Sequence, residues 1–360
     1  MEQSLFPDLV KKWFRPLVLR YVQELNGNLN PLPYLHTQLT DQVFSVTGTW
    51  DTVSEQNQFV RADYIALDSP IPTKTSGGTS AMGGKIPKIG IERWLNEQQL
   101  TDLQTTIAVG GTEAQIVKNL FNHTKAVIAG QYLTNEGTFL RAFSDGVAEV
   151  DSENVGAGIR VDYGYYPENK FGVSIPWTSA STADPIADID RAKNKVNGDG
   201  NATQVIYLDK FALNSLINSQ AFRDRYAISI GNTSSVKPTP GEDVAITLLK
   251  SLTGMNVVLI DRSIKYQING ATGSYKPWAE GRLVLAPAGQ VGSLVYARLA
   301  EESSPVAGVT YEKADSYIQV SKFRMNRPSL AEYTNSQSRS LPVITNVDQI
   351  YTIDTKTVQA

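Results

Sequence analysis

The chain contains no cysteine among its 360 residues. Disulfide bonds, thiolate metal ligands and cysteine nucleophiles are therefore excluded, and the fold must be stabilised by burial, hydrogen bonds and association with other subunits. A basic excess is also missing, because 33 Lys and Arg stand against 36 Asp and Glu and give a net charge of −3. A protein that binds DNA mainly through counterion release would carry many more cations than anions.

Segments that direct a chain to a membrane are lacking as well. The start, Met-Glu-Gln-Ser-Leu, has no basic stretch followed by an apolar one, so we expect no secretory signal. No apolar run approaches the ~18 residues of a membrane span. We therefore expect no membrane partner, and synthesis and assembly in a cytoplasm.

The composition that remains is typical of a globular protein, with 41% apolar and 19% charged residues. The length predicts one large domain or two to three interleaved subdomains. Residues 7–25 carry apolar side chains at helical spacing and predict an amphipathic helix, which lies on its own domain in preference to a neighbouring chain. Residues 27–33, Gly-Asn-Leu-Asn-Pro-Leu-Pro, predict an extended connector.

Residues 43–66 alternate in polarity and predict strands. The following segment, 68–90, is rich in Gly, Ser and Pro and cannot form its own core. Because strand-like runs flank it, the segment predicts the tip of a long two-stranded arm that needs a partner surface. A phosphate-binding loop is disfavoured, since its pattern needs Gly in place of Thr79 and Ser or Thr in place of Ile86.

The clearest local pattern is the capping box Thr112-Glu113-Ala114-Gln115. Apolar residues then recur at spacings of three and four as far as Tyr132. The pattern predicts one helix from there to about Ala142, and ~30 residues at a rise of ~1.5 Å would form a rod of about 45 Å. A rod of that length suggests a scaffold across which other segments lie.

The second half predicts a compact subdomain in which capped helices and short strands alternate. Asp184 and Pro185 begin one helix, which Lys193, Lys195 and a left-handed Gly198 end. Asp209 caps a second helix. Thr239-Pro240-Gly241-Glu242 repeats the capping-box pattern before a third helix. That helix runs to about Thr253, and Gly254 ends it. The expected strands are 205–208, 257–260, 283–285, 294–297 and 317–320.

Three aspartates could form a catalytic carboxylate cluster, namely Asp184, Asp188 and Asp190. Their position at a predicted helix N-terminus gives a simpler explanation, because anions are favoured at the positive end of the helix dipole. The run Asn197-Gly198-Asp199-Gly200-Asn201 has the alternating oxygens of a calcium loop. It has Ala202 where such a loop needs glycine and Leu208 where it needs glutamate, which favours a polar turn.

Histidines and aromatic residues offer little more. Only His36 and His123 are present, too few and too far apart in the sequence to indicate a zinc site or a triad. Tyr163, Tyr165 and Tyr166 could stack on a sugar or a base, but packing in a sheet is the simpler interpretation. We therefore expect no catalytic residue, no metal site and no cofactor.

The order of these elements resembles the capsid fold of tailed bacteriophages, the Hong Kong 97 type. Residues 62–70, Ala-Asp-Tyr-Ile-Ala-Leu-Asp-Ser-Pro, and 84–90, Gly-Lys-Ile-Pro-Lys-Ile-Gly, are similar to the extended-loop region of phage major capsid proteins. Further segments are similar to capsid proteins of phages that infect Bacteroidetes. These segments are 260–263, 276–281, 299–301, 304–309 and 342–348.

The resemblance implies an α+β fold divided into named parts. They are an N-terminal arm (1–46), an extended loop (47–97), a peripheral subdomain with the long spine helix (98–175), an axial subdomain (176–312), a return strand of the peripheral subdomain (313–340) and a C-terminal strand of the axial subdomain (341–360). Some relatives cross-link their shells through a lysine–asparagine bond. Lys74, Lys85 and Lys88 lie in the corresponding loop, but nothing in the sequence assigns that chemistry to them.

The function implied is that of a structural major capsid protein, which forms hexamers and pentamers of an icosahedral shell. The expected partners are other copies of the chain, scaffolding, portal and decoration proteins, and packaged double-stranded DNA bound non-specifically at the inner face. Two alternatives stay open. One is an encapsulin-like shell that encloses enzyme cargo, and the other is a cytoplasmic hydrolase or sugar-binding enzyme that uses Asp184, Asp188 or Asp190.

Overall fold

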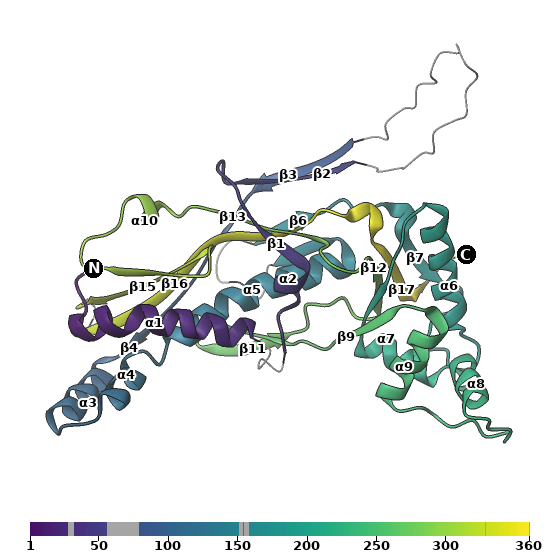
Figure 1. Ribbon diagram of the computed structural model, residues 1–360, viewed down its shortest axis with the longest axis horizontal. Helices are drawn as coiled ribbons and strands as arrows, with labels where there is room; N and C mark the ends of the chain where they lie inside the picture. The colour runs from purple at the N-terminus through teal and green to yellow at the C-terminus, as the bar shows by residue number, and fades with distance from the viewer. Residues whose placement is uncertain (28–31, 56–78, 151–153, 155–157, 328, 360) are drawn as a thin grey trace, which may run out of the picture. The chain divides into compact units, whose positions relative to one another are not determined.

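The computed structural model describes residues 1–27, 32–55, 79–150, 154, 158–327 and 329–359 (Figure 1). The chain divides into two compact units that it enters more than once. Unit 1 comprises Met1–Trp50, Gly83–Thr138 and Ser293–Val343. Unit 2 comprises Asp51–Met82, Phe139–Gly292 and Ile344–Ala360.

Unit 1 is built on a six-stranded sheet in which the long strand β16 (Ala331–Ile344) is central. β15 (Ile318–Met325) pairs antiparallel with one edge of β16, and β14 (Thr310–Ala314) pairs antiparallel with β15. β4 (Lys88–Leu95) pairs antiparallel with the other edge of β16. β13 (Gly292–Ala297) also joins β16, and β1 (Thr40–Phe44) follows β13. Side chains alternate between the two faces, and the even-numbered residues of β16 from 332 to 344 are buried.

Helices cover the face of the sheet to which these even-numbered side chains point. The helices of unit 1 are α1 (Pro7–Asn26), α2 (Leu35–Leu39), α3 (Glu97–Ala108), α4 (Glu113–Leu120), α5 (Thr124–Asp145), which continues into unit 2, and α10 (Ala300–Ser303). α1 buries Val10, Phe14 and Val18 in the same core as α5 and the sheet. The predicted N-terminal helix is therefore confirmed, and its apolar face packs on its own unit, as expected.

The predicted long helix is wrong in one respect. The capping box at Thr112 and Gln115 is present, but α4 ends at Leu120, and a turn separates it from α5. Phe121 leaves the helical conformation, with φ −110° and ψ 15°, and its ring stacks on Phe14 at 6.0 Å between centroids. The ammonium of Lys322 donates to the Leu120 carbonyl at 3.1 Å, so that carbonyl is satisfied by the sheet rather than by the next helical turn.

The predicted two-stranded arm is present in its described part. β2 (Thr49–Glu55) pairs with β3 (Thr79–Lys85) as a separate two-stranded sheet. The prediction of an irregular tip over 68–90 is wrong from residue 79 onward, because Gly83 and Gly84 are extended and belong to β3. The strand expected near 59–66 and the rest of the tip lie outside the described residues.

Unit 2 contains a five-stranded mixed sheet in the order β7-β17-β12-β8-β9. Its strands are β7 (Lys170–Val173), β17 (Tyr351–Val358), β12 (Arg282–Ala286), β8 (Val205–Asp209) and β9 (Asn256–Ile260). β12 is antiparallel to both neighbours, whereas β17 with β7 and β8 with β9 run parallel. Four helices share its core: α6 (Pro185–Gly198), α7 (Lys210–Asn218), α8 (Gln220–Ser229) and α9 (Glu242–Thr253).

The helix boundaries of unit 2 test the predicted caps. Asp184 and Asp209 cap α6 and α7 through their carboxylates, and Gly254 ends α9 with a φ of 73°, all as predicted. The capping box predicted at Thr239–Glu242 is wrong, because Gly241 is the N-cap and no side chain caps α9. The predicted left-handed Gly198 is also wrong, because Gly198 is the last residue of α6 and Gly200 has the positive φ of 76°.

Small elements complete unit 2. β5 (Val147–Val150) pairs with β6 (Ile159–Asp162), and β10 (Ile264–Ile268) forms a hairpin with β11 (Ala271–Tyr275). Asn269 and Gly270 both have positive φ in the hairpin turn, which suits a two-residue connection. Single 3-10 turns occur at Pro167–Asn169 and Val347–Gln349. Among the described residues, no helix is both long enough and apolar enough to cross a bilayer.

Candidate functional site

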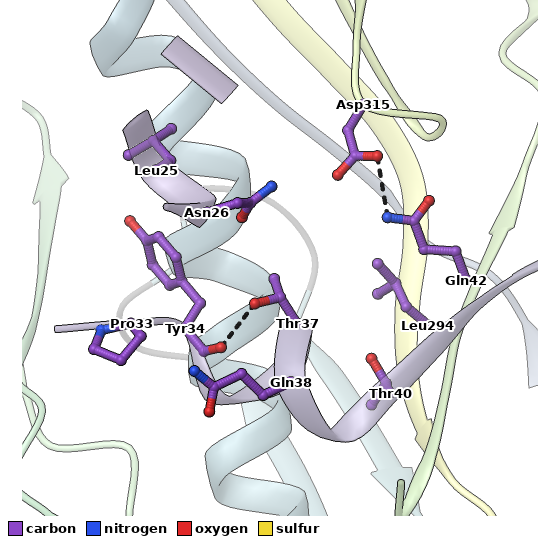
Figure 2. A pocket seen from close by; sticks show the side chains of 10 residues that line it. All are labelled: Leu25, Asn26, Pro33, Tyr34, Thr37, Gln38, Thr40, Gln42, Leu294 and Asp315. Atoms are coloured by element: carbon purple, nitrogen blue, oxygen red, sulfur yellow. Dashed lines mark hydrogen bonds between the residues drawn. The ribbon is translucent and has the colours of Figure 1, made fainter. Parts of the chain in front are cut away.

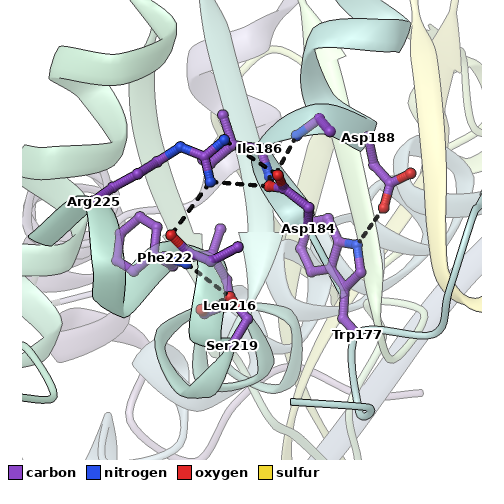
Figure 3. A network of polar contacts seen from close by, with 10 residues as sticks. Trp177, Asp184, Ile186, Asp188, Leu216, Ser219, Phe222 and Arg225 are labelled. Carbon is purple, nitrogen blue, oxygen red and sulfur yellow. Dashed lines mark hydrogen bonds and ion pairs between the residues drawn. The ribbon is translucent and has the colours of Figure 1, made fainter. Parts of the chain in front are cut away.

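The aspartates at the start of α6 have separate surroundings, and Figure 3 shows the partners of Asp184 and Asp188. The Asp184 carboxylate accepts from the backbone N–H groups of Ile186 and Ala187, at 3.2 and 3.3 Å, and pairs with the Arg225 guanidinium at 3.1 Å. Asp188 is buried and accepts from the indole Nε1 of Trp177 at 2.9 Å. Asp190 is exposed. Asp184 therefore caps the helix, as the simpler interpretation predicted, whereas Asp188 forms core hydrogen bonds that the sequence did not indicate.

The segment that resembles a calcium loop is a polar turn. Asn201 donates to the Asp348 carbonyl at 3.0 Å and to the Tyr351 hydroxyl at 2.8 Å. The Tyr351 hydroxyl in turn donates to Asp199 at 2.9 Å. These bonds tie the end of α6 to the start of β17. In the described part of the chain no group of three or more carboxylate or histidine side chains has a metal-binding arrangement.

Of the three tyrosines that could have formed a stacking patch, Tyr163 and Tyr165 are buried in unit 2, and Tyr166 is half-buried. Tyr163 and Tyr165 are both almost inaccessible, and burial raises the pKa of each phenol. The Tyr165 hydroxyl donates to the Phe143 carbonyl at 3.3 Å. Two buried rings present no surface on which a sugar or a base could stack.

The two histidines lie in different settings, His36 in the buried core and His123 in a turn. His36 is completely buried, and its Nδ1 lies 2.6 Å from Glu136 Oε2. The same carboxylate group accepts from the backbone N–H groups of Leu35 and His36, both at 3.0 Å. Burial alone would raise the pKa of Glu136, but these contacts with His36 and Leu35 hold it below its ordinary value. The pair thus fastens α2 to α5, a contact that the sequence did not indicate.

His123 lies in the turn between α4 and α5 rather than inside a long helix, which corrects its predicted position. Burial and the nearby cations Arg93 and Lys322 lower the pKa of its imidazole. It is therefore neutral at physiological pH, consistent with a packing role.

A seam of buried polar side chains joins α5 to β16 in unit 1. Ser336 Oγ donates to the Val127 carbonyl at 2.6 Å, and Gln131 Nε2 donates to the Ser336 carbonyl at 3.0 Å. Ser338 Oγ donates to Gln131 Oε1 at 2.8 Å, and Asn135 Nδ2 donates to Ser340 Oγ at 3.1 Å. The five polar side chains of the seam are all fully buried: Gln131, Asn135, Ser336, Ser338 and Ser340.

Such a seam fixes how the helix sits on the strand. Some of these groups have two partners within the seam, since Ser338 Oγ also lies 3.1 Å from Ser340 Oγ, and a slip of either element would leave donors and acceptors unpaired in the core. The spacing of four residues on α5 and of two residues on β16 brings one polar group of each element together per helical turn. The seam is therefore a structural register device with no reactive group.

Lys322 is a further buried polar residue at this helix–sheet interface, outside the seam. Its ammonium donates to the Leu120 carbonyl and to Thr334 Oγ1, both at 3.1 Å, and lies 5.2 Å from the centre of the Phe121 ring. Burial lowers the pKa of this lysine to about 8, and the charge of Glu332 opposes the decrease. These two hydrogen bonds and the contact with the aromatic ring stabilise the buried ammonium, so the burial of this lysine has a structural explanation.

The root of the two-stranded arm is held firmly in unit 1. Trp50 is buried, and a Cβ added at Gly84 would lie only 3.1 Å from its indole Nε1. Ile86 is buried as well and donates from its backbone N–H to the Gly48 carbonyl at 3.0 Å. Gly48 has a φ of 72°, and a Cβ there would meet the Arg339 guanidinium at 2.6 Å. The positive φ of Gly48 favours glycine at the root, and the close approach of Gly84 to Trp50 leaves little room for a Cβ there.

A hollow of about 300 Å3 lies between the end of α1, α2 and the start of β1 (Figure 2). Its one carboxylate, Asp315, accepts from Gln42 Nε2 at 3.1 Å and from the Tyr132 hydroxyl at 2.9 Å. The Tyr132 oxygen itself accepts from Asn26 Nδ2 at 3.0 Å. A single carboxylate already engaged by two donors offers neither an acid–base pair nor a metal ligand set.

Comparison with known proteins identifies the family. A family model described as phage major capsid protein E matches residues 22–355. Among solved structures, the putative capsid protein of a prophage of E. coli CFT073 superposes with a TM-score of 0.57 at 13% identity, over 94% of this chain and 98% of that chain. A phage-related protein from Bordetella bronchiseptica RB50 gives 0.55 at 13% identity, over 96% and 98%. No curated protein matches the chain significantly.

The structural matches establish the fold, which is the α+β capsid fold of the Hong Kong 97 type that the order of elements predicted. The family match extends over nearly the whole chain, so it applies to both units. Asp184, Asp188, His36 and Tyr165 are engaged in structural contacts, which agrees with a protein that acts through its surfaces. The chain belongs to the phage major capsid protein E family and is a structural subunit of an icosahedral phage shell, not an enzyme.

Proposed function

We propose that the chain assembles into hexamers and pentamers, which together close the shell around double-stranded DNA. The observation that carries the proposal is the separate two-stranded sheet of β2 and β3. Two paired strands are marginally stable in water unless a further surface covers them. A neighbouring subunit would supply that surface, so association would stabilise an element that the single chain stabilises poorly.

Exposed apolar side chains of unit 2 support the same proposal. Ile228 and Val236 are 77% and 76% exposed, and Ile230 is 51% exposed; Ile228 lies in the last turn of α8, and the other two lie between α8 and α9. Three exposed branched side chains so close in sequence are typical of a protein–protein contact. Contacts between subunits would bury them in the shell.

The DNA contact in this proposal is weak and non-specific. A net charge of −3 does not favour tight binding to phosphates. Enclosure of the genome does not require such tight binding. Scaffolding, portal and decoration proteins complete the set of partners that the family resemblance implies. Assembly in the cytoplasm of a bacterial host, with a host among the Bacteroidetes, also belongs to the proposal.

The subdomain assignments form a further part. The arm (1–46) would include α1, and the extended loop (47–97) would include β2, β3 and β4. The peripheral subdomain (98–175 and 313–340) would carry α5 as its spine helix. The axial subdomain (176–312 and 341–360) would include the five-stranded sheet.

The proposal is tested by expressing the full chain alone and following it by size-exclusion chromatography and negative-stain electron microscopy. Closed shells, tubes or rings of five and six subunits are expected. A chain that stays monomeric, even with a crowding agent and its phage's scaffolding protein, would refute the proposal. An encapsulin-like compartment, the nearest alternative, would be indicated by shells that package a host enzyme, although the family match favours a phage shell.

A further inference from the structure

The chain passes from the unit 1 sheet into the two-stranded arm through a bend at residues 45–49, which we call the arm bend. β1 ends at Phe44 and β2 begins at Thr49, so the bend is short. Val46 at its tip is 88% exposed, whereas Gly48 is buried. Gly48 turns the chain with a φ of 72°, a conformation that glycine adopts without strain.

The side chain of Ser45 closes the arm bend. Its Oγ accepts from the backbone N–H of Gly48 at 3.1 Å and donates to the Thr49 carbonyl at 2.6 Å. The backbone N–H of Ser45 donates to the Tyr296 carbonyl of β13 at 2.7 Å, next to the pairing of β1 with β13. A serine hydroxyl that bonds to nearby backbone groups stabilises a turn where no sheet ladder can do so. Ser45 therefore ties the bend to the sheet and also to itself.

The carbonyl of Gly48 is the point at which both strands of the arm are bonded to the sheet. It accepts from the backbone N–H of Ile86, just after β3, at 3.0 Å. It also accepts from Arg339 Nη2 of β16 at 3.4 Å, while Nη1 of the same guanidinium donates to the Arg298 carbonyl at 3.5 Å. These two contacts are long, but the guanidinium also packs against Gly48, where an added Cβ would lie 2.6 Å from Nη2. A planar guanidinium with several fixed donors suits such a position between two carbonyls.

The partners of the arm bend lie in the same unit as the bend itself. Ser45 and Gly48, like Ile86, Tyr296 and Arg339, all belong to unit 1. The bend can therefore keep its path in a single subunit, although the paired strands beyond it are marginally stable alone. A binding element that is ordered in advance loses less conformational entropy when its partner arrives.

We propose that the arm bend is preset, and that Ser45 and Arg339 are the positioning residues that fix the path of the arm before a neighbouring subunit contacts it. The consequence for assembly rests on the proposed function, in which a neighbour covers the arm. An arm that leaves its subunit along one path meets the neighbour at a defined angle, so the bend contributes to the curvature of the shell. Without Ser45 or Arg339, the bend keeps its glycine but lacks the bonds that select one conformation.

The absence of native cysteine permits a direct test, because two introduced cysteines can carry a pair of spin labels. Gln23→Cys lies at an exposed position of α1, and Asp51→Cys lies at an exposed position of β2. Pulsed electron paramagnetic resonance then measures the distance between α1 and the arm in the unassembled subunit. One narrow distance distribution is expected, and Ser45→Ala and Arg339→Met should each broaden it.

Controls separate the arm bend from general effects of substitution. Lys88→Met should leave the distribution narrow, since Lys88 is exposed and lies opposite Arg339 in the pairing of β4 with β16. Ser45→Thr, which keeps the hydroxyl, should also leave it narrow. Circular dichroism checks that each labelled variant is folded, and if one of the two bend variants does not fold, the other decides. A broad distribution without any bend substitution, or narrow distributions in the folded bend variants, would overturn the proposal.

Assembly supplies the second readout. In negative-stain electron microscopy, shells of the wild type and of Lys88→Met are expected to have one diameter. Ser45→Ala and Arg339→Met are expected to give mixed diameters or open sheets, because the arm meets its neighbour at variable angles. Variant shells that all keep the wild-type diameter would overturn the role of the bend in assembly. Failure of the wild-type chain to form any shell would refute the proposed function instead, and the distance measurement would still decide whether the bend is preset.

Discussion

The buried ammonium of Lys322 makes the stability of the subunit depend on alkaline pH in a defined direction. Folding takes the side chain out of water, and this burial lowers its pKa from 10.5 to about 8. Between these two pH values the unfolded chain binds more protons than the folded one. The free energy of unfolding must therefore rise with pH over this window.

The size of the effect follows from the two pKa values. A tenfold difference in proton affinity corresponds to about 1.4 kcal/mol, so Lys322 alone should increase the unfolding free energy by about 2.5 kcal/mol between pH 7 and pH 10. The window closes near pH 10, because burial raises the pKa of several tyrosines, including Tyr132 and Tyr351. Above that pH the unfolded chain loses phenolic protons that the folded chain keeps, and the stability falls again.

The assay is urea unfolding of the full-length subunit, followed by tryptophan fluorescence at pH 7, 8, 9 and 10. Lys322→Met keeps most of the buried volume and removes the titrating group, so its unfolding free energy should lack the rise between pH 8 and pH 10. Lys265→Met, at an exposed lysine on β10, should keep the wild-type rise. Equal pH dependence in the wild type and in Lys322→Met would refute the reasoning.

Three further substitutions and one surface control, Glu24→Gln, are compared by urea unfolding at pH 7. Glu136→Gln should lower the unfolding free energy by about 3 kcal/mol, because it leaves a buried histidine without its carboxylate, whereas Glu24→Gln at a surface ion pair should change it by less than about 1 kcal/mol. Ser338→Val should cost about 1–3 kcal/mol, since the Oε1 of Gln131 loses its donor. Gly48→Ala should lower the unfolding free energy by about 1 kcal/mol or more, because alanine is strained at the positive φ of this position. The same substitution should quench or shift the fluorescence of Trp50 at the arm root. Unchanged spectra and an unchanged unfolding free energy would contradict this prediction.

The elements that could be predicted from the sequence are those set by local rules. Asp184 and Asp209 cap helices because a carboxylate that precedes a helix can reach its free N–H groups, whatever lies further away. Gly254 ends α9 for an equally local reason, since glycine adopts a left-handed conformation readily. The order of such elements was sufficient to indicate the capsid fold.

The errors occur where distant segments decide the outcome. The pattern from Thr112 onward is helical throughout, but Lys322, about 200 residues away along the chain, takes the Leu120 carbonyl, and Phe121 turns into the core. Gly84 reads as a loop residue in isolation, and only the indole of Trp50 beside it shows why a strand needs glycine there. Neither contact has a local pattern in the sequence.

The seam between α5 and β16 illustrates the same limit for polar residues. Ser336, Ser338 and Ser340 alternate with other polar residues, so the sequence reads as an exposed strand. In the structure these three side chains are completely buried and face Gln131 and Asn135. A hydrophobic interface would tolerate small shifts of the helix along the strand, because apolar contacts are not directional. Matched hydrogen bonds do not, so in a subunit whose neighbours depend on its shape, the polar seam favours one arrangement of helix and sheet over its close alternatives.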